Sequence, residues 1–359
     1  MRGFYDSKEL ELVSKRTMAM TGSEGCYWDW GMGVANFGLV KAYRQTKDKK
    51  IFDYLKKFVD DNLNGDEILK TVNTVIPYMV ALFLYEETGE AFYAERCRET
   101  AEWLMNGAAR TRNGGLAHSA PKDEWAMRRI SGVSTSIEAE NQQIKSWADQ
   151  LWVDTLYMAA IFLTEAGMKL NNRQYIDEAW KQIKIHAECI QAENGLFYHG
   201  YSESLNNNRS AVLWGRGNGW VAACIPEICE LTGEKDSEAV KIFQKHMEAL
   251  VRVQDKNGLW HTVLDEPASY CETSASAGIV YGMMKGIKLG LLPESYIEPA
   301  KRGYEAVIAK IAEDGKVTDV SQGTGIRETK ESYMEVPTIK IMTWGQGLAL
   351  MMLAEPKLW

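Results

Sequence analysis

Residues 72–118 read VNTVIPYMVALFLYEETGEAFYAERCRETAEWLMNGAARTRNGGLAH and contain one complete unit of a repeating pattern. The first part of this stretch is an almost unbroken apolar run that ends at Thr88-Gly89. The second part has apolar residues at helical spacing on one face and charged residues on the other, and Asn-Gly-Gly-Leu follows it. A continuous apolar run is typical of a helix that is buried on all sides, whereas a one-sided stripe is typical of a helix that covers a core. The stretch therefore predicts a hairpin of one buried and one amphipathic helix.

The same unit recurs along the chain, and such internal repetition indicates a fold built from repeats. Besides 72–118, hairpins are predicted over 32–63, 151–200, 216–263 and 272–317. A sixth buried helix is predicted at TWGQGLALMMLAE (343–355), and no amphipathic partner follows it. The amphipathic segment 7–20 has no partner before it. This segment can therefore cover the sixth buried helix and close a ring.

Six buried helices ringed by six amphipathic ones form an (α/α)6 barrel, so we predict an all-α fold with residues 1–359 in a single domain. A chain of this length could hold two domains, but a closed barrel can use it as one unit. An open solenoid is the alternative arrangement of helical hairpins. The unpaired half-hairpin at each end of the chain favours closure.

Composition narrows the possible functions. The net charge is −8 without a basic stripe or tail, which argues against nucleic acid as a partner. There is no run of 18 apolar residues and no apolar leader, so we expect neither a membrane span nor a signal peptide, and we predict a cytoplasmic protein that is monomeric or weakly oligomeric. The six cysteines are scattered without a disulfide framework and fit free thiols. The 12 Trp and 16 Tyr are numerous, and sugar pockets stack pyranose rings on such side chains.

If the hairpins alternate inner and outer helices, every inner helix starts at the same end of the barrel. The residues at these starts are aromatic, polar or glycine: Tyr27-Trp28-Asp29-Trp30-Gly31, Asn73, Trp152-Val153-Asp154, Trp214-Gly215-Arg216-Gly217-Asn218-Gly219-Trp220, Glu272-Thr273-Ser274 and Trp344-Gly345. Three histidines follow Asn-Gly turns at the same end: His118, His199 and His261. This gathering predicts a funnel-shaped site into which helix N-termini point, an arrangement that favours anions.

Several of these residues also have ordinary structural explanations. An Asp in the first turn of a helix is more often a cap than a catalyst. Asp154 stands in an otherwise apolar run, where a carboxylate is costly unless it is hydrogen-bonded or takes part in catalysis. Asp29 lies between two tryptophans, and it too is either a helix cap or a catalytic residue. Arg216 lies between glycines and either pairs with a carboxylate or stays open to a ligand. Glu272 is better explained as a charge at a helix start.

We expect neither a metal ion nor a cofactor. The histidines lack paired ligand spacing, and there is no HExxH motif and no P-loop. The run GRGNG at 215–219 opens a predicted helix without the preceding strand that a dinucleotide fingerprint requires.

Five short motifs together carry a resemblance to a known group of enzymes: NGGLAH (113–118), QLWVDTLYMA (150–159), GLFYHGY (195–201), WGRGNGW (214–220) and ETSASAG (272–278). In this order they resemble the unsaturated glucuronyl and rhamnogalacturonyl hydrolases of glycoside hydrolase families 88 and 105, and they are closer to family 105. The pieces span most of the predicted barrel. Trp-x-Asp-x-Leu-Tyr-Met and Trp-x-Arg-Gly-Asn-x-Trp together are a specific signal.

The resemblance implies an enzyme that removes a 4,5-unsaturated uronic acid from the non-reducing end of a lyase-generated oligosaccharide. It places Asp154 on the catalytic aspartate of the family. His118, His199, Trp214, Arg216 and Trp220 fall on positions that line the uronate pocket. Other residues of the predicted site, which we also expect to contact the substrate, are Trp28, Asp29, Trp30, Asn73, Trp152 and Gly217.

Three features depart from the family pattern. Asn73 stands where a second Asp is usual, and Ser119 stands where a Lys often follows the His118 position. The stretch 119–147 is longer than in many members, which affects the subsite for the leaving sugar.

The residues fit this chemistry independently of the resemblance. An unsaturated uronate is an enol ether, so protonation of C4 by one carboxyl group generates a cation at C5 that water can capture. We expect burial beside Trp152 to raise the pKa of Asp154, and we expect Arg216 and a histidine to hold the substrate carboxylate. Two alternatives stay open. One is an inverting glycosidase that uses Asp29 and Asp154 as its carboxyl pair, and the other is a non-catalytic oligosaccharide-binding protein.

Overall fold

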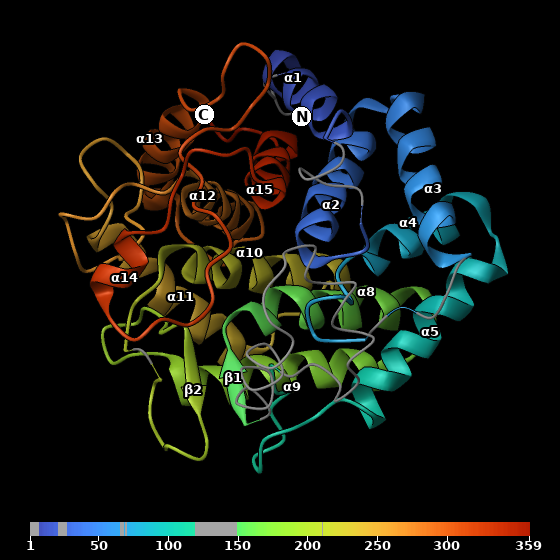
Figure 1. Cartoon of the computed structure of the whole chain (residues 1–359), viewed down its shortest axis with the longest axis horizontal. Helices are drawn as coiled ribbons and strands as arrows, with labels where there is room; N and C mark the ends of the chain where they lie inside the picture. Colours follow the sequence, from blue (N-terminus) through green and yellow to red (C-terminus); the bar gives the residue numbers. More distant parts are fainter. Residues whose placement is uncertain (1–6, 21–26, 65–67, 69, 119–148, 210) are drawn as a thin grey trace, which may run out of the picture.

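A computed structural model describes residues 7–20, 27–64, 68, 70–118, 149–209 and 211–359 of the chain. Within these residues, helices alternate between an inner and an outer ring (Figure 1). The inner helices are α2 (Trp30–Thr46), α4 (Tyr78–Thr88), α8 (Ile161–Lys169), α10 (Gly215–Thr232), α12 (Thr273–Lys288) and α15 (Thr343–Ala354). The outer helices are α1 (Ser7–Met18), α3 (Lys49–Leu63), α5 (Ala91–Asn106), α9 (Arg173–Ile190), α11 (Ser237–Arg252) and α13 (Ile297–Ile308).

The inner ring is closed. Each inner helix contacts the next one in the chain, and α15 returns to pack against α2. The N-terminal helix α1 packs on α15, so it is the outer partner that the sixth inner helix lacks in the sequence after it. The predicted all-α barrel with one shared core is therefore confirmed, and the open solenoid is excluded.

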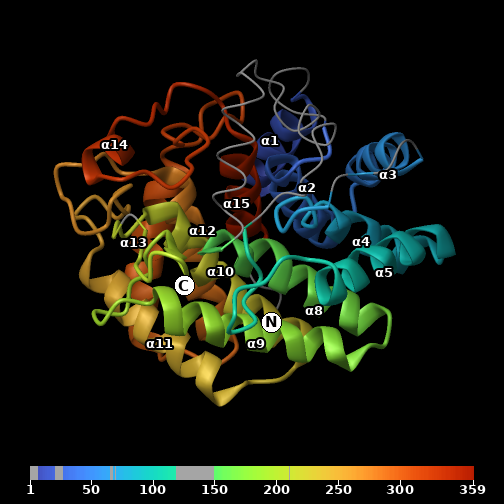
Figure 2. The same cartoon turned by 60° about the horizontal axis from the view of Figure 1, so that its bottom comes forward.

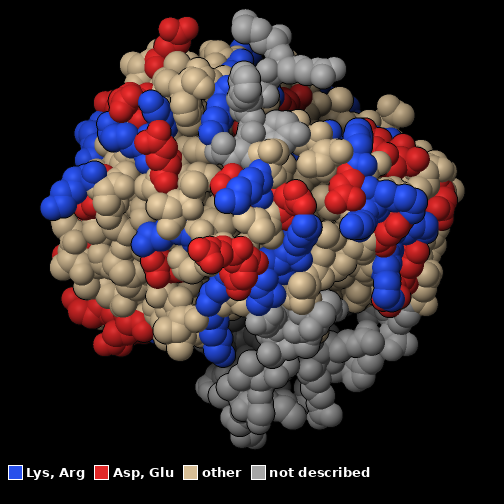
Figure 3. Space-filling model, turned by 90° about the horizontal axis from the view of Figure 1, so that it is seen from above, with Lys and Arg blue, Asp and Glu red and all other residues tan. Residues whose placement is uncertain are grey.

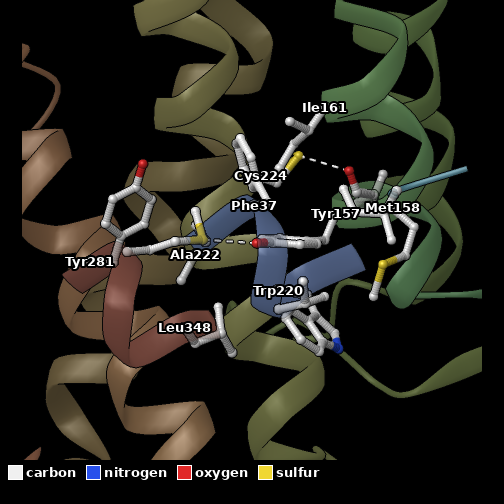
Figure 4. Packing of buried hydrophobic residues seen from close by; sticks show 14 of the residues in the cluster. Phe37, Tyr157, Met158, Ile161, Trp220, Ala222, Cys224, Tyr281 and Leu348 are labelled. Atoms are coloured by element: carbon white, nitrogen blue, oxygen red, sulfur yellow. Dashed lines mark hydrogen bonds between the residues drawn. The ribbon is translucent and has the colours of Figure 1, made fainter. Parts of the chain in front are cut away.

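The two rings differ because their helices bury different fractions of their surface. Every residue of α10 from Gly215 to Cys229 is buried, whereas only one stripe of α11 is. Inner helices approach each other backbone to backbone where glycines permit it. A Cβ on Gly282 of α12 would lie 2.1 Å from the carbonyl oxygen of Ala222 on α10. Large side chains such as Phe37 fill the centre of the barrel between these close contacts (Figure 4).

The Asn-Gly and Asp-Gly turns of the repeats dock hairpins onto the next outer helix. Gly195, Gly258 and Gly315 have positive φ angles of 98°, 92° and 84°, a conformation that favours glycine. A Cβ on Gly195 would lie 2.6 Å from the carbonyl oxygen of Lys245 on α11. One on Gly315 would lie 2.2 Å from that of Leu12 on α1, so the last such turn rests on the N-terminal helix. The repeated turn thus contributes to ring closure.

Two inner elements start differently from the sequence prediction. Asn73 does not open a helix: it lies in a turn braced by hydrogen bonds between Thr71 and Thr74, and α4 begins only after Pro77. After Asp154 the chain forms a π-helical turn, η2 (Leu156–Ala160), before α8 begins. The thiol of Cys224 donates to the carbonyl oxygen of Leu156 (3.0 Å), which stabilises this turn. Single π turns often occur at functional sites.

Short elements at one end of the barrel complete the fold. Strand β1 (Gln150–Trp152) pairs antiparallel with β2 (Gly200–Ser202), with Trp152 opposite Gly200. The connection between α13 and α15 contains α14 (Lys330–Met334) and runs over the ends of α12 and α13 (Figure 2). A single 3-10 turn, η3 (Glu294–Tyr296), precedes α13.

Charged residues of both signs are mixed over the surface, and a cluster of charged side chains is buried near the end of α10. Acidic and basic side chains are interspersed on the face shown in Figure 3. Near the end of α10, the buried Glu227 binds Lys41 of α2 and Lys285 of α12, the latter at 2.7 Å. Burial works to raise the pKa of Glu227, but Lys285 and Lys41 together lower it well below its ordinary value. Among the described helices, none is long and apolar enough to cross a membrane, and the described cysteines are free.

Candidate active site

The paired strands bring Asp154 beside His199. Asp154 follows β1 directly, His199 precedes β2, and the backbone N–H of Val153 donates to the carbonyl oxygen of His199 (2.9 Å). As a result, Nε2 of His199 faces Oδ2 of Asp154 at 3.5 Å. The Asp154 side chain is 13% exposed and the imidazole is fully buried. The carboxyl group is thus largely buried in an aromatic site, with a small part of its side chain open to solvent.

Aromatic rings form an arc on both sides of His199. The indole of Trp152 stacks on His118 with ring centroids 4.0 Å apart and meets the edge of His199 at 5.2 Å. On its other side, His199 stacks on Trp214 at 4.0 Å. Trp152 is oriented by its own Nε1, which donates to the side-chain oxygen of Gln150 (2.8 Å). The arc therefore joins the start of the third hairpin to the start of α10.

The arc continues through Arg216 to the first and last inner helices. The guanidinium of Arg216 lies over the Trp214 ring at 4.6 Å and over Trp344 at 5.2 Å. Trp344 in turn stacks on Trp30 with centroids 4.4 Å apart. Residues at helix starts that are distant in sequence thus converge on one rim, as the repeat pattern predicts.

Arg216 is not open to a ligand in the way that its flanking glycines suggest. Its Nη1 donates to the carbonyl oxygen of Ser321 (3.1 Å), and its Nη2 donates to the carbonyl oxygen of Gln322 and the hydroxyl of Thr324, both at 3.1 Å. Glu272 lies 3.7 Å from the guanidinium while also capping α12. The guanidinium is therefore held by a loop and a buried carboxylate, and Nε is the nitrogen without a hydrogen-bond partner among the described residues.

Tyr333 of α14 is a site residue that the sequence analysis missed. Its hydroxyl lies 2.6 Å from Nδ1 of His199, and the backbone N–H of Arg327 donates to the same oxygen (3.3 Å). With the amide donating to Oη, the hydroxyl hydrogen can be donated to Nδ1, which leaves the ring proton on Nε2 and directed at Asp154. The one available signal was the length of the connection 309–342, because long connections in compact domains are often functional.

The groups around Asp154 lower its pKa, whereas the sequence analysis expected burial to raise it. Burial works to raise the pKa of Asp154, but the hydrogen bond and the charge of His199, followed by the charges of His118 and Arg216, bring it below its ordinary value. Burial lowers the pKa of His118 to about 4 and also lowers that of His199. The expectation that burial keeps Asp154 protonated is therefore wrong for the protein without substrate. Near neutral pH, Asp154 is therefore a carboxylate beside the imidazole of His199.

Asn73, Trp28 and Asp29 lie at the neighbouring helix starts. Nδ2 of Asn73 faces Nε2 of His118 at 3.5 Å, so Asn73 joins the arc at its far end. The indole of Trp28 donates to the carbonyl oxygen of Thr74 (3.2 Å) and thereby holds the turn that carries Asn73. Asp29 caps α2 by accepting the N–H of Met32 (2.8 Å), and burial raises its pKa to about 6.

Three predicted positions have other structural explanations, and Trp214, although it belongs to the aromatic arc, is also buried. Trp220 is fully buried and packs against Tyr157 in the core, so its indole cannot stack on a ligand (Figure 4). Gly217 lets α10 approach the Asp154 turn closely, because a Cβ there would lie 2.6 Å from Cγ1 of Val153. His261 pairs with Asp255 in a different cluster. Ser119 and the stretch 119–147 lie outside the described residues.

Comparison with known proteins agrees with this geometry. Residues 11–357 match Glycosyl Hydrolase Family 88. The unsaturated rhamnogalacturonyl hydrolase YesR of Bacillus subtilis is 32% identical over 355 residues, which cover 98% of this chain and 96% of YesR. An unsaturated 3S-rhamnoglycuronyl hydrolase of an Alteromonas species is 28% identical over 343 residues, which cover 92% of this chain and 78% of that protein.

Solved structures share the fold. A possible member of the GH105 family from Salmonella enterica superposes with a TM-score of 0.86 at 27% identity, over 99% of this chain and 95% of that one. The unsaturated glucuronyl hydrolase of Bacillus sp. GL1 has the same fold, with a TM-score of 0.73 at 17% identity over 96% and 94% of the two chains. The resemblance noted in the sequence motifs is thus confirmed. The chain belongs to Glycosyl Hydrolase Family 88 and is a glycoside hydrolase.

Proposed function

We propose that the enzyme removes a 4,5-unsaturated uronic acid from the non-reducing end of oligosaccharides that a polysaccharide lyase has produced, with rhamnogalacturonan-type oligosaccharides as the first candidates. The observation that carries the proposal is the carboxyl group of Asp154, which lies in an arc of indoles and imidazoles with one guanidinium nearby. Flat rings of this kind can stack on a half-planar unsaturated sugar. The names of the relatives, above all the rhamnogalacturonyl hydrolase, support the same substrate class.

Asp154 is the proposed catalytic residue. Its protonated carboxyl group delivers the proton to C4, and the C4=C5 π electrons form the new C–H bond and leave an oxocarbenium-like cation at C5. Water attacks C5 and gives a proton back to the Asp154 carboxylate, which restores the acid. The resulting hemiketal opens to a 5-keto uronate, and the sugar that was glycosidically linked leaves with its oxygen. No attack at the anomeric carbon is needed.

We propose that bound substrate raises the pKa of Asp154, so that this residue can carry the proton that it delivers. Without substrate, the pKa of Asp154 lies below its ordinary value because of His199 and Arg216. A bound uronate carries a negative charge into the same site, and a like charge nearby raises the pKa of a carboxyl group. Because Arg216 is buried and held by the 321–324 loop, its positive charge is proposed to attract the uronate without any loss of these loop contacts.

A second candidate activity is inverting hydrolysis with Asp29 as the acid. The observation in its favour is that burial raises the pKa of Asp29 to about 6, so part of this carboxyl is protonated near neutral pH. The two activities put solvent atoms in different places. Hydration adds a solvent hydrogen to C4, whereas inverting hydrolysis adds solvent oxygen to the anomeric carbon and leaves the double bond intact.

The deciding experiment follows one turnover in deuterated water. The substrates are a panel of lyase-generated disaccharides, and the loss of the enol-ether absorbance identifies those that react. NMR of the released uronate should show deuterium at C4. A released sugar that keeps its double bond would assign the reaction to the inverting mechanism, and no turnover of any disaccharide would leave only oligosaccharide binding. The cytoplasmic location and the monomeric or weakly oligomeric state stay predictions.

A further inference from the structure

The loop between α11 and α12 holds a cluster of potential metal ligands outside the candidate active site. Asp255, His261 and Cys271 each offer one ligand atom, and these three atoms all lie within 4.8 Å of one another. An antiparallel bridge sets His261 opposite Cys271, ten positions further along the chain, and Sγ of Cys271 lies 3.9 Å from Nδ1 of the imidazole. The His261 side chain is 10% exposed and that of Asp255 is 24% exposed. The cluster is therefore enclosed on most sides but reachable from solvent.

The imidazole of His261 is oriented so that Nε2 can act as a ligand. Its Nδ1 lies 2.6 Å from the carbonyl oxygen of Ser269, so Nδ1 carries a hydrogen and donates it. In a neutral ring the lone pair is then on Nε2, which faces Oδ2 of Asp255 at 3.3 Å. Two acceptors at this distance repel each other unless a proton or a metal cation lies between them. A backbone carbonyl on the second ring nitrogen is also the usual partner of a metal-bound histidine.

Asn257 orients the other two side chains of the cluster. Its backbone N–H donates to Oδ1 of Asp255 (2.9 Å), which leaves Oδ2 directed at His261. Its side-chain amide donates to Sγ of Cys271 (3.3 Å), a contact that stabilises a thiolate. Carboxylate, imidazole and thiolate are the ligands that zinc takes in proteins.

We propose that Asp255, His261 and Cys271 bind one divalent transition-metal ion of the zinc type, with water as the fourth ligand. Cys271 binds as a thiolate, and its thiol proton passes to solvent on binding. The same hairpin braces the start of α10, because Val263 bridges to Trp214 and the N–H of Gly215 donates to the carbonyl oxygen of Thr262 (2.8 Å). The ion therefore cross-links the loop that supports Trp214 in the arc of aromatic rings. It takes no part in the reaction. No known metal-binding motif marks this site in the sequence, because five and nine residues separate the successive ligands.

The test titrates the full chain, first stripped with a chelator, with Zn²⁺ by calorimetry and with Co²⁺ by absorbance. One equivalent of metal should bind, and Co²⁺ should develop a thiolate charge-transfer band. Removing an outer partner of a bound metal typically costs about 10–100-fold in affinity. The variants Cys271→Ser and Asp255→Asn remove a ligand directly and should cost at least that much. Asp255→Asn keeps an oxygen that can accept the N–H of Asn257, so the loop should stay folded.

The matched control is Cys189→Ser. The thiol of Cys189 receives the same contact from a side-chain amide, that of Asn113 at 3.3 Å, but among the described residues it belongs to no group of metal ligands. This variant should bind Zn²⁺ as the unmodified chain does, and Zn²⁺ should raise the Tm of both but not of Cys271→Ser. Binding that neither ligand variant weakens, or no stoichiometric binding at all, would overturn the proposal. So would imidazole NMR signals showing His261 protonated on both nitrogens and unmoved by zinc, because a proton alone would then bridge it to Asp255.

Discussion

The substitution Tyr333→Phe tests whether α14 orients the histidine beside Asp154. It removes the hydroxyl that lies 2.6 Å from Nδ1 of His199 and leaves this nitrogen without a partner inside a fully buried ring. Leaving a buried polar group unsatisfied costs about 1–3 kcal/mol. If this cost falls on the transition state, because the ring no longer holds its proton on Nε2, kcat falls by about 5–160-fold. KM should change little, since the hydroxyl is committed to His199 and the Arg327 amide rather than to a ligand.

The pH profile gives a signature that a merely structural role would not produce. Asp154 must be protonated to act on C4, so activity falls as the pH rises through its pKa. In Tyr333→Phe the imidazole can move its proton to Nδ1, and Asp154 then loses the N–H that helps to lower its pKa. Burial then dominates and raises the pKa, so the fall in kcat/KM should move to higher pH.

The assay is steady-state kinetics across pH on a reactive unsaturated disaccharide, combined with ¹⁵N chemical shifts of the labelled histidines. A suitable control is Tyr43→Phe, which removes a hydroxyl that donates to Glu87 (3.0 Å) at the exposed end of α2. The control should leave kcat and its pH profile unchanged. A Tyr333→Phe enzyme with kcat within about twofold of the parent, an unmoved pH profile and the His199 proton still on Nε2 would show that Tyr333 does not orient His199.

Further outcomes follow from the same contacts. Asp154→Asn should keep the fold and lower kcat by at least about 10²–10⁴-fold, since the residue supplies two proton transfers, and more than a tenth of the activity remaining would remove it from this role. Asp29→Asn should keep most of the activity and the stability, because Asn caps a helix as well as Asp does, whereas a loss as large as that of Asp154→Asn would favour the inverting mechanism. In the unmodified enzyme kcat should begin to fall at a higher pH than kcat/KM, because bound uronate raises the pKa of Asp154; coincident profiles would contradict this. Glu227→Gln should lower the free energy of unfolding at pH 7 by about 3–5 kcal/mol, because Lys285 is left buried with weaker partners. The pKa of Glu227 is lowered on folding, so this stabilisation is present above the unfolded pKa of about 4.3 and is lost at lower pH, and denaturant unfolding at both pH values would show the two proteins converging in acid.

Local patterns in the sequence were enough to predict the barrel and the end of it at which the candidate site lies. Hydrophobic periodicity reports which face of each helix is buried, and that is a local property of the chain. The run of repeats therefore predicted the inner and outer rings, and the unpaired segment 7–20 predicted how the ring closes. Because all inner helices then start at one end, the gathering of Trp152, Asp154 and Trp214 there followed without any tertiary information. The structure confirms each of these points.

The contacts that each of these residues makes could not be predicted from local patterns, because they depend on how distant segments pack. Arg216 is bound by a loop 105 positions away, and His199 is oriented by Tyr333 across 134 positions. Both partners lie in a connection without hydrophobic periodicity, so no local pattern marks them. Trp220 belongs to the same motif as Trp214 but packs against Tyr157 in the core, because each residue of a helix is rotated about 100° from the one before and the packed neighbours decide which side faces the rim. The pKa of Asp154 is the clearest case. Burial alone predicts that this pKa rises. It is lowered instead, because folding brings His199, His118 and Arg216 from three other segments close to the carboxyl group.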